Sequence, residues 1–332
     1  MMDGIHRGEN APAALRMKLD AGREVARLSQ CLRDDVHTRL RRRGAVLGLS
    51  GGVDSAVVAA LCAHALGKDK ILAVLMPERE SSPESVGLAA NWAERLEIEA
   101  VVEDITSALE GSGCYRRRDA AIQRVFPAYG AGWRSKITLP GSLLEDETLN
   151  VFSLTVVSPD GEQQTQRVLS TDYFQIVAAS NLKQRMRMAM LYYHAELRNF
   201  AVIGTANRNE HDLGFFVKYG DGGVDLSPIV HLFKSQVYLL AEYLDVPSEI
   251  RSRPPTSDTY SAGSTQEEFF FRLPFETLDS IWAGWEAGVT IKDLAAELRL
   301  EDHQIQRVID DLIRKQRTTQ YLRSAPLTYA AQ

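Results

Sequence analysis

A short segment, GLSGGVDS at residues 48–55, has the composition of a phosphate-binding loop. It stands between an apolar run typical of a strand and a helix-forming run, so the amides and dipole of that helix would attract an anion. Gly51 and Gly52 let the backbone approach the anion closely, while Ser50 and Ser55 supply hydroxyl donors. The segment has neither the GK[ST] element of a Walker A loop nor a GxGxxG pattern. A purely structural glycine turn is the alternative interpretation.

A phosphate loop without lysine leaves several negative charges uncompensated. We therefore expect the chain to supply a divalent cation and a distant cationic side chain. Mg²⁺ prefers hard oxygen ligands and keeps several waters, so one or two carboxylates suffice. Three later blocks carry suitable residue types: NLKQRMRM at 181–188, GTANRNEHDLGFFVKYGDGGVDLSPIVHLFKSQ at 204–236 and RPPTSD at 253–258.

The SGGxDS pattern resembles the pyrophosphate loop of the N-type ATP pyrophosphatases, which cleave ATP between its α and β phosphates and release AMP. With the three later blocks, in the same order and spacing, residues 44–258 are similar to the ammonia-dependent NAD synthetases. This resemblance implies an ATP-dependent amidation of deamido-NAD with ammonia. The products would be NAD, AMP and pyrophosphate, formed through an acyl-adenylate with Mg²⁺ present.

Carried over to this sequence, the resemblance also implies which residues bind ATP and the metal. Asp54 and Glu210 match the carboxylates that hold Mg²⁺, and Lys234 matches the lysine that reaches the ATP phosphates. With Ser50 and Ser55, Asp54 and Lys234 form the expected catalytic set, because they would stabilise the departing pyrophosphate. The full set of expected ATP contacts is Gly48, Leu49, Ser50, Gly51, Gly52, Val53, Asp54, Ser55, Thr205, Lys234 and Thr256.

Three further residues, Arg185, Lys218 and Asp225, match those that hold deamido-NAD in the family. The two cations suit an anionic dinucleotide, and the carboxylate can accept from a ribose hydroxyl or an amine. Each residue also has a structural interpretation: a solvated helix residue, a surface lysine and a turn former, respectively. Glu210 has one as well, since a glutamate near a helix start can cap that helix.

Strand-like and helix-like runs alternate along the chain. This pattern predicts an α/β fold with a doubly wound, mostly parallel sheet, and the resemblance implies a Rossmann-like adenine nucleotide hydrolase-like fold. The expected strands are 45–49, 71–76, 100–103 and 200–204. The expected helices of this region are 54–66, 83–96, 173–197 and 234–244.

We divide the chain into an N-terminal helix at 1–43, an ATP pyrophosphatase/NAD synthetase domain at 44–270 and a C-terminal helical appendage at 271–332. Residues of about 111–170 break the alternation and read as an insertion with a β-hairpin. The hairpin pairs VFSLTVV with QTQRVL across a turn at 158–161, where Asp-Gly is a strong turn signal. A decorative surface loop and a docking place for an ammonia-delivering partner are both open roles for the insertion.

The composition of the chain indicates which class of protein it belongs to. Hydrophobic residues make up 45% and charged residues 25%, as in ordinary globular chains, and a net charge of -6 disfavours nucleic-acid binding. Cys31, Cys62 and Cys114 are too few for a disulfide framework and read as reduced, buried thiols. With no apolar leader and no bilayer-length apolar run, we expect a cytoplasmic protein.

The expected partners are small molecules: ATP, deamido-NAD and ammonia. The resemblance also implies a homodimer with the dinucleotide bound near the interface. Only about 40 residues precede the first strand, too few for an amidase domain, so free ammonia or a separate ammonia source is expected. The family usually ends with a His-Lys pair, whereas this chain has Tyr321, Leu322 and Arg323 there.

Two other functions stay open at this point. One is a different amide-forming or adenylating enzyme that acts on another carboxylate. The other is a DNA-binding regulator, because residues 290–312, TIKDLAAELRLEDHQIQRVIDDL, resemble a helix-turn-helix. Acidic residues in this segment disfavour DNA binding, because they would repel the phosphates of the backbone: Glu301, Asp302, Asp310 and Asp311. A packing role for these helices is the preferred interpretation.

Overall fold

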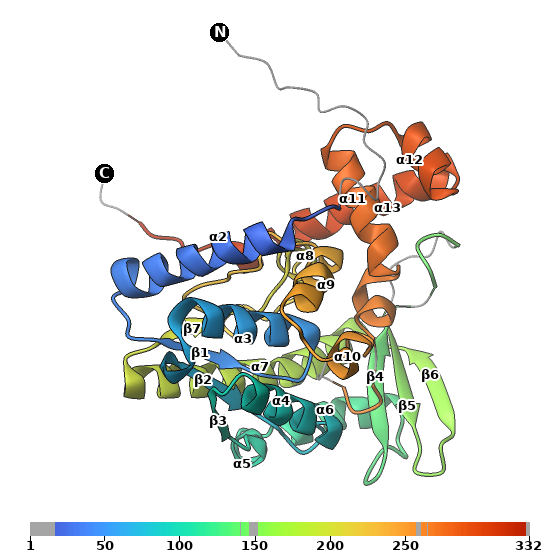
Figure 1. The fold of residues 1–332 in the computed structure, drawn as a ribbon. Helices are drawn as coiled ribbons and strands as arrows, with labels where there is room; N and C mark the ends of the chain where they lie inside the picture. Colours follow the sequence, from blue (N-terminus) through green and yellow to red (C-terminus); the bar gives the residue numbers. More distant parts are fainter. Residues whose placement is uncertain (1–16, 140, 146–151, 257–259, 264, 330–332) are drawn as a thin grey trace.

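The computed structural model describes residues 17–139, 141–145, 152–256, 260–263 and 265–329 (Figure 1). At its centre lies a four-stranded sheet with the order β3-β2-β1-β7, in which every neighbouring pair is parallel. The strands are β1 (Ala45–Gly48), β2 (Ile71–Leu75), β3 (Glu99–Val102) and β7 (Ala201–Ile203). All four predicted strands are confirmed, each within two residues at either end.

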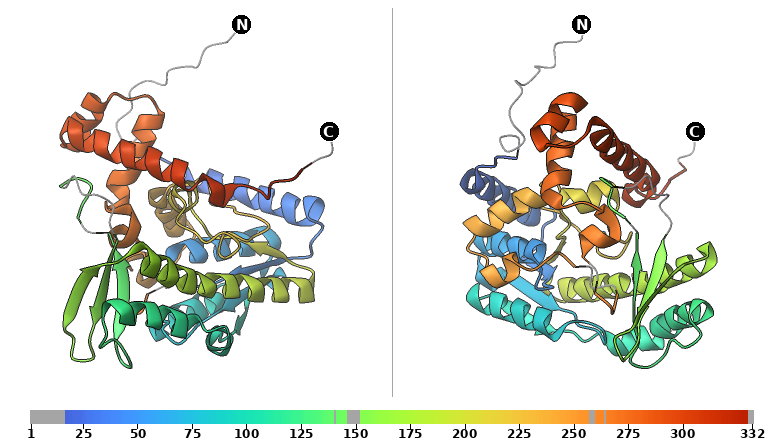
Figure 2. Two further views of the ribbon diagram at one scale, coloured as in Figure 1. Left: turned by 180° about the vertical axis from the view of Figure 1, so that it is seen from behind. Right: turned by 90° about the vertical axis from the view of Figure 1, so that its right-hand side faces the viewer.

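The central strands are apolar on both faces, as expected for a parallel sheet covered by helices. In β1, Ala45 and Leu47 belong to the hydrophobic core on one face, whereas Val46 belongs to the core on the other. Helices α2 (Ala21–Asp34), α3 (Val53–Leu66), α4 (Pro83–Arg95) and α9 (Lys234–Tyr243) pack on the first face. The long helix α7 (Ser170–Arg198) covers the second, which confirms the doubly wound architecture (Figure 2).

Several shorter helices complete this region. They are η1 (Asp35–Arg39), η2 (Lys68–Lys70), α5 (Thr106–Gly111), α8 (Arg208–Leu213), α10 (Ser248–Arg251) and η3 (Glu267–Phe271). No helix in the described part of the chain combines the length and the apolar character that crossing a membrane requires. Cys62 and Cys114 are buried free thiols, as predicted, but Cys31 is exposed on α2, so that part of the prediction is wrong.

The N-terminal helix is shorter than the sequence predicts. The apolar periodicity suggests a helix from about residue 12, and residues 12–16 lie outside the described part of the chain. Helix α2 begins at Ala21 because the Asp20 side chain caps it by accepting from the Arg23 amide at 2.9 Å. The chain then continues through the single π-helical turn of η1 before it enters β1.

The insertion forms a second, antiparallel sheet with the order β4-β5-β6 beside helix α6 (Figure 1). Its elements are α6 (Cys114–Val125), β4 (Arg134–Thr138), β5 (Ser153–Val157) and β6 (Gln163–Arg167). The predicted hairpin is β5-β6 and is confirmed, whereas α6 and β4 were not expected. Apolar periodicity does not predict α6, because the buried face of this helix includes the charged residue Arg118, which is 3% exposed.

A buried network of charges joins the insertion to the central sheet. Lys183 of α7 donates to Glu78 at 2.9 Å and to Glu80 at 2.7 Å, both in the segment after β2. From α6, Arg118 donates to Glu80 at 2.6 Å and the Tyr115 hydroxyl donates to Glu78 at 2.6 Å. Burial alone would raise the pKa of Glu80, but Arg118 and Lys183 lower it to about 2. Arg118 is therefore a buried structural residue of this network.

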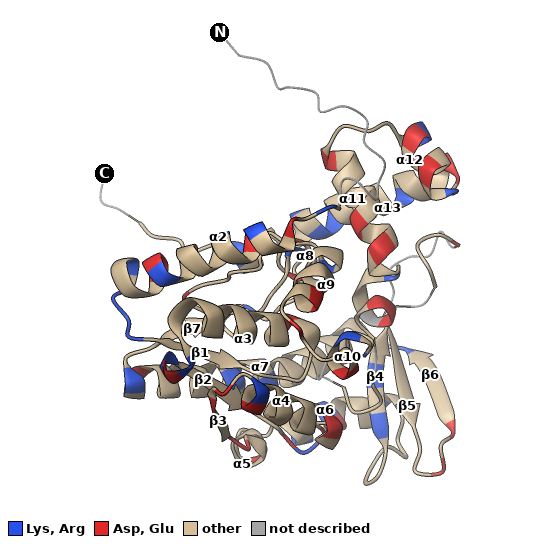
Figure 3. Cartoon of the chain, in the orientation of Figure 1, with Lys and Arg blue, Asp and Glu red and all other residues tan. Residues whose placement is uncertain are grey.

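The C-terminal appendage forms a second hydrophobic core. It contains α11 (Phe275–Glu286), α12 (Ile291–Leu298), α13 (Asp302–Thr318) and α14 (Gln320–Arg323). In the segment that resembles a helix-turn-helix, Leu294, Ile305 and Leu312 are buried in this core beside Trp282. The helices of the appendage carry acidic as well as basic residues (Figure 3). The geometry thus favours the packing role for these helices.

Replacing Lys183 with Met should destabilise the fold by about 3–5 kcal/mol, because two buried carboxylates would lose their shared cation. Urea unfolding followed by circular dichroism measures the change in the free energy of unfolding. Lys68→Met is the matched control, since Lys68 pairs with Glu97 at the exposed surface and its loss should leave the unfolding midpoint unchanged. Equal effects of the two substitutions would contradict a structural role for the network.

Candidate active site

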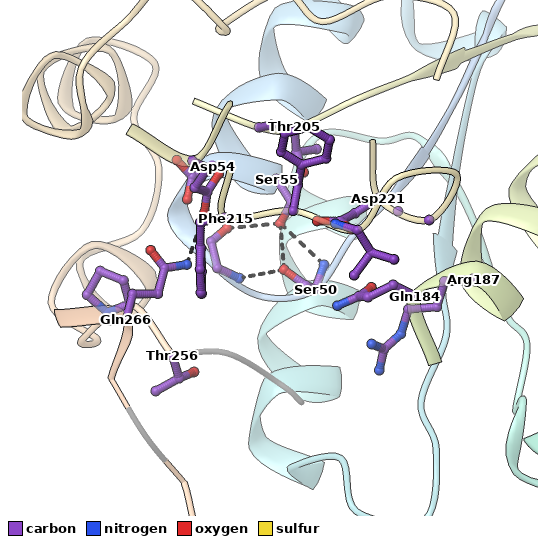
Figure 4. Close-up of a pocket in the computed structure, with 18 of the residues that line it drawn as sticks. Ser50, Asp54, Ser55, Gln184, Arg187, Thr205, Phe215, Asp221, Thr256 and Gln266 are labelled. Carbon is purple, nitrogen blue, oxygen red and sulfur yellow. Dashed lines mark hydrogen bonds between the residues drawn. The ribbon is translucent and has the colours of Figure 1, made fainter. Parts of the chain in front are cut away.

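A cavity of about 460 Å³ opens at the carboxyl ends of β1 and β7, within the usual range for small-molecule sites. Ligands of doubly wound sheets bind at this edge, where connections leave adjacent strands in opposite directions. The loop after β1, the loop after β7 and helix α7 all contribute to its walls (Figure 4). The cavity residues from these three segments are 48–55, 203–206, Tyr173, Val177, Asn181, Gln184, Arg187, Met188 and Leu191.

The loop at 48–55 lines the cavity along its whole length and leads into α3. Gly51 has a φ of +79°, and a Cβ there would lie 2.4 Å from the Ser85 carbonyl oxygen, so no other residue fits. The Ser50 and Ser55 hydroxyls lie 3.1 Å apart, and Ser55 donates to the Gly52 carbonyl at 3.0 Å (Figure 4). These bonds shape the loop before any ligand arrives, and they place the N-terminus of α3 at the cavity.

Beside the loop lies a compact group of charged side chains. Lys234, the first residue of α9, is 1% exposed, and its ammonium donates to the Asp54 carboxylate. The other Asp54 oxygen accepts from the side-chain amide of Asn207 at 2.9 Å. Glu210 accepts from the Gln266 side chain at 3.0 Å. All of these residues except Asn207 line the cavity.

The charges of this group depend on one another. Burial raises the pKa of Glu210, and the neighbouring Asp54 carboxylate raises it further. Burial alone would lower the pKa of Lys234, but Asp54 and Glu210 raise it above the ordinary value of a lysine. The site therefore holds a charged lysine among carboxylates, an arrangement suited to anionic phosphates and to a divalent cation.

Helix ends position these side chains. Asn207 caps α8 by accepting from the Glu210 amide at 3.0 Å, and the Glu210 carboxylate accepts from the Asn207 amide at 3.1 Å. The interpretation of Glu210 as a helix cap is therefore correct, and the same side chain also faces the cavity. Asn209 accepts from the Lys234 amide at 2.9 Å and donates to Asp279, a fully buried carboxylate of α11. The appendage thus helps to hold α8 and α9 in place.

The structure brings together every residue expected to bind ATP or the metal. Asp54, Thr205, Glu210, Lys234 and Thr256 all line the cavity that contains the loop. The three residues expected to hold deamido-NAD lie elsewhere, since none of them lines this cavity. The roles of both groups stay predictions.

Arg185 lies on α7, whereas Lys218 and Asp225 lie in the chain between α8 and α9. Arg185 is exposed, and its guanidinium lies 3.4 Å from the Lys218 carbonyl oxygen. The Lys218 ammonium donates to the carbonyls of Tyr321 and Ser324 at 2.9 and 2.8 Å, so the C-terminal segment contacts this group. Asp225, also exposed, accepts from the Tyr192 hydroxyl at 3.1 Å and from the Val202 amide at 2.8 Å.

Sequence reasoning missed several polar and aromatic residues of the cavity: Ser85, Asn181, Gln184, Arg187, Phe215, Asp221, Arg253 and Gln266. A signal for some of them is present in the sequence. Residues 177, 181, 184, 188 and 191 of α7 all line the cavity, and their spacing of three or four is that of one helix face. Recognising this face in the sequence would have distinguished the side of α7 that lines the cavity from the side that carries Arg185.

A family model described as NAD synthase matches residues 24–121 and 148–326 of this chain. An NH(3)-dependent NAD(+) synthetase from Rhizobium rhizogenes is 49% identical over 311 residues, covering 94% of this chain and 93% of that protein. A protein of the same name from Mesorhizobium japonicum is 50% identical over 311 residues, covering 94% and 97%.

Two solved structures share the fold. An NMN synthetase from Francisella tularensis has a TM-score of 0.63 at 23% identity, over 94% of this chain and 99% of its own. An NH3-dependent NAD synthetase from Campylobacter jejuni has a TM-score of 0.60 at 24% identity, over 94% and 100%. At these identities the likeness concerns the fold alone. The family match and the two relatives at about half identity show more: the chain belongs to the NAD synthase family.

Proposed function

We propose that this protein is an AMP-forming amide ligase that converts deamido-NAD, ATP and ammonia into NAD, AMP and pyrophosphate. The observation that carries this proposal is the ion pair of buried Lys234 with the partly buried Asp54 beside a preformed phosphate loop. Family membership and the names of the relatives support the identity of the substrate. A cytoplasmic location remains a prediction from composition.

The residues of the chain act mainly by positioning and by charge stabilisation. The N-terminus of α3 and the loop hold the β and γ phosphates of ATP, while the acid's carboxylate attacks the α phosphorus. Lys234 stabilises the negative charge that builds up on the leaving pyrophosphate. Ammonia then attacks the acyl-adenylate, and AMP leaves. No protein nucleophile takes part in this scheme.

Mg²⁺ fits the site as a partner of the phosphates. Asp54 and Glu210 would hold it, because both are carboxylates on the cavity wall close enough for one to raise the pKa of the other. No group of three or more His, Cys, Asp or Glu side chains suited to a metal occurs among the described residues. Two carboxylates with phosphate oxygens and water match the preference of Mg²⁺. The ion would neutralise phosphate charge when it is bound.

Deamido-NAD requires a second binding surface, and the outer group of Arg185, Lys218 and Asp225 is the proposed one. The contact of Lys218 with the C-terminal segment supports a role for that segment where the family has a His-Lys pair. A homodimer that completes this surface is part of the proposal. Exposed apolar side chains of α7, Tyr193 and Leu197, support such contacts between subunits.

The direct test supplies purified protein with ATP, Mg²⁺, ammonium and deamido-NAD. We expect NAD, AMP and pyrophosphate in equal amounts. Nicotinate mononucleotide and other carboxylic acids serve as competing acceptors in parallel reactions. Pyrophosphate release with one of these acids, and none with deamido-NAD, would instead support an adenylating enzyme that acts on another carboxylate.

Lys234→Met should lower kcat by a factor of about 10²–10³, because the leaving pyrophosphate loses its cationic partner. Steady-state kinetics with saturating ATP measure the effect, and circular dichroism checks that the variant is folded. Lys292→Met, at an exposed position of α12, is the control and should keep wild-type activity. Near-normal turnover of the Lys234 variant would exclude the assigned role.

The raised pKa of Glu210 predicts a pH-dependent metal site. The carboxyl holds its proton at a pH where an ordinary glutamate is ionised, and Mg²⁺ needs the ionised form. Affinity for Mg²⁺ in the presence of ATP should therefore increase as pH rises through this pKa, with release of a proton. Calorimetry in buffers of different ionisation enthalpy measures that proton. Glu210→Gln should weaken binding and abolish the proton release, and a variant that still releases it would contradict the assignment.

A further inference from the structure

The segment between α10 and η3 forms one wall of the cavity. Its described residues include Arg253, Pro254, Pro255, Thr256, Tyr260 and Gln266, all of which face the cavity. Thr256 is an expected ATP contact, and Gln266 donates to Glu210 at 3.0 Å. We call the described residues of this segment (252–256, 260–263 and 265–266) the wall segment, and their position affects both the nucleotide and the metal carboxylate.

The wall segment is attached to the insertion through a buried side chain. Tyr260 is 7% exposed and belongs to the hydrophobic core of the insertion. That core otherwise consists of residues from α6 and the turn after it, from strands β4 and β5, and from the start of α7, among them Ile122, Ile137 and Leu154. Tyr260 is thus the residue of this core that belongs neither to the insertion nor to α7. Its burial attaches the wall segment to both.

Backbone hydrogen bonds reinforce this attachment at the open edge of the small sheet. Strand β4 pairs with β5 on one side only, so its other edge is available to another segment. The Ser135 amide donates to the Ser261 hydroxyl at 3.0 Å, and the Ala262 amide donates to the Ser135 carbonyl at 3.1 Å. The wall segment therefore occupies the edge of β4 and buries its tyrosine in the core beneath.

The part of the chain that forms this edge lies outside the residues that the family model matches. The NAD synthase model matches residues 24–121 and 148–326, so it leaves out 122–147, which contains all of β4. The attachment of the wall segment thus depends on a portion of the insertion that the family model does not describe. A decorative loop would not account for a buried anchor and two hydrogen bonds to a cavity wall.

We propose that the insertion is an internal brace that orders the wall segment before ATP binds, with Tyr260 as its positioning residue. The physical benefit is preorganisation, because the conformational entropy of the wall segment is lost on folding rather than on nucleotide binding. The idea rests on the proposed function only in that the cavity binds ATP. It needs no assumption about the acid that is activated.

Two substitutions in the full-length protein break the attachment in different places. Tyr260→Ala removes the buried ring, and Ser135→Pro removes the donor to Ser261 at a strand edge where proline is tolerated. Ser135 does not line the cavity, so its replacement acts on ATP through the wall segment or through the core, where its hydroxyl accepts from Tyr129 at 3.4 Å. Tyr260→Phe keeps the ring and is the conservative rescue. Leu154→Ala is the matched control, because it truncates the same core at a residue that lies outside the wall segment and does not line the cavity.

The readouts are the Kd for ATP by calorimetry without any acid substrate, and amide hydrogen exchange at residues 260–263. If loss of the anchor leaves the wall segment in place a tenth of the time, Kd should rise about tenfold. We expect that rise, with faster exchange, for Tyr260→Ala and Ser135→Pro, while Tyr260→Phe and Leu154→Ala stay near the wild type. KM for ATP should rise by the same factor with little change in kcat.

Faster exchange with an unchanged Kd would overturn the proposal, because order in the wall segment would then not matter for ATP. An equal rise in Kd for Leu154→Ala would also overturn it, since general loosening of the insertion would be the cause. The result is independent of the proposed function: a wild-type protein that binds ATP tightly but makes no NAD would contradict the amidation alone.

Discussion

The structure depends on one electrostatic constraint: a buried lysine must remain charged between carboxylates at the edge of the sheet. Lys234 is enclosed by protein and pairs with Asp54, and its charge counteracts part of the rise in the pKa of Glu210 that burial and Asp54 cause. Three segments far apart in sequence meet to satisfy this constraint: the start of α3, the capped start of α8 and the start of α9. The start of α3 presents backbone amides that favour phosphate oxygens, whereas the first amides of α8 and α9 donate to side chains of the protein.

The rest of the fold holds these three helix starts in position. Parallel strands β1 and β7 end side by side, so the loops that follow them converge. Asp279 of the appendage holds Asn209, and through it the backbone of Lys234. On the other side, the insertion is attached to the rest of the fold by the ion network around Lys183 and by Tyr260, which lines the cavity. Peripheral segments thus contribute order to the site without supplying its reacting groups.

Much of this arrangement can be predicted from the sequence because its signals are local. Uninterrupted apolar runs predict the strands of the sheet. A glycine loop before a helix predicts the phosphate site. Helix α6 could not be predicted in this way, because Arg118 occupies a buried position that only its partners Glu80 and Asp119 make acceptable. The pairing of β4 with the wall segment is likewise a tertiary contact between distant residues. Distinguishing Arg187, in the cavity, from Arg185, outside it, required the orientation of α7.

The central claim is that the acid's carboxylate attacks the α phosphorus of ATP at this site. Deamido-NAD labelled with ¹⁸O in its carboxylate tests the claim directly, because the oxygen that bonds to phosphorus leaves with the nucleotide when ammonia attacks. Mass spectrometry of the products should find one ¹⁸O in AMP and none in pyrophosphate. Unlabelled nucleotide, with the label in inorganic phosphate, would show attack at the γ phosphorus and contradict the account.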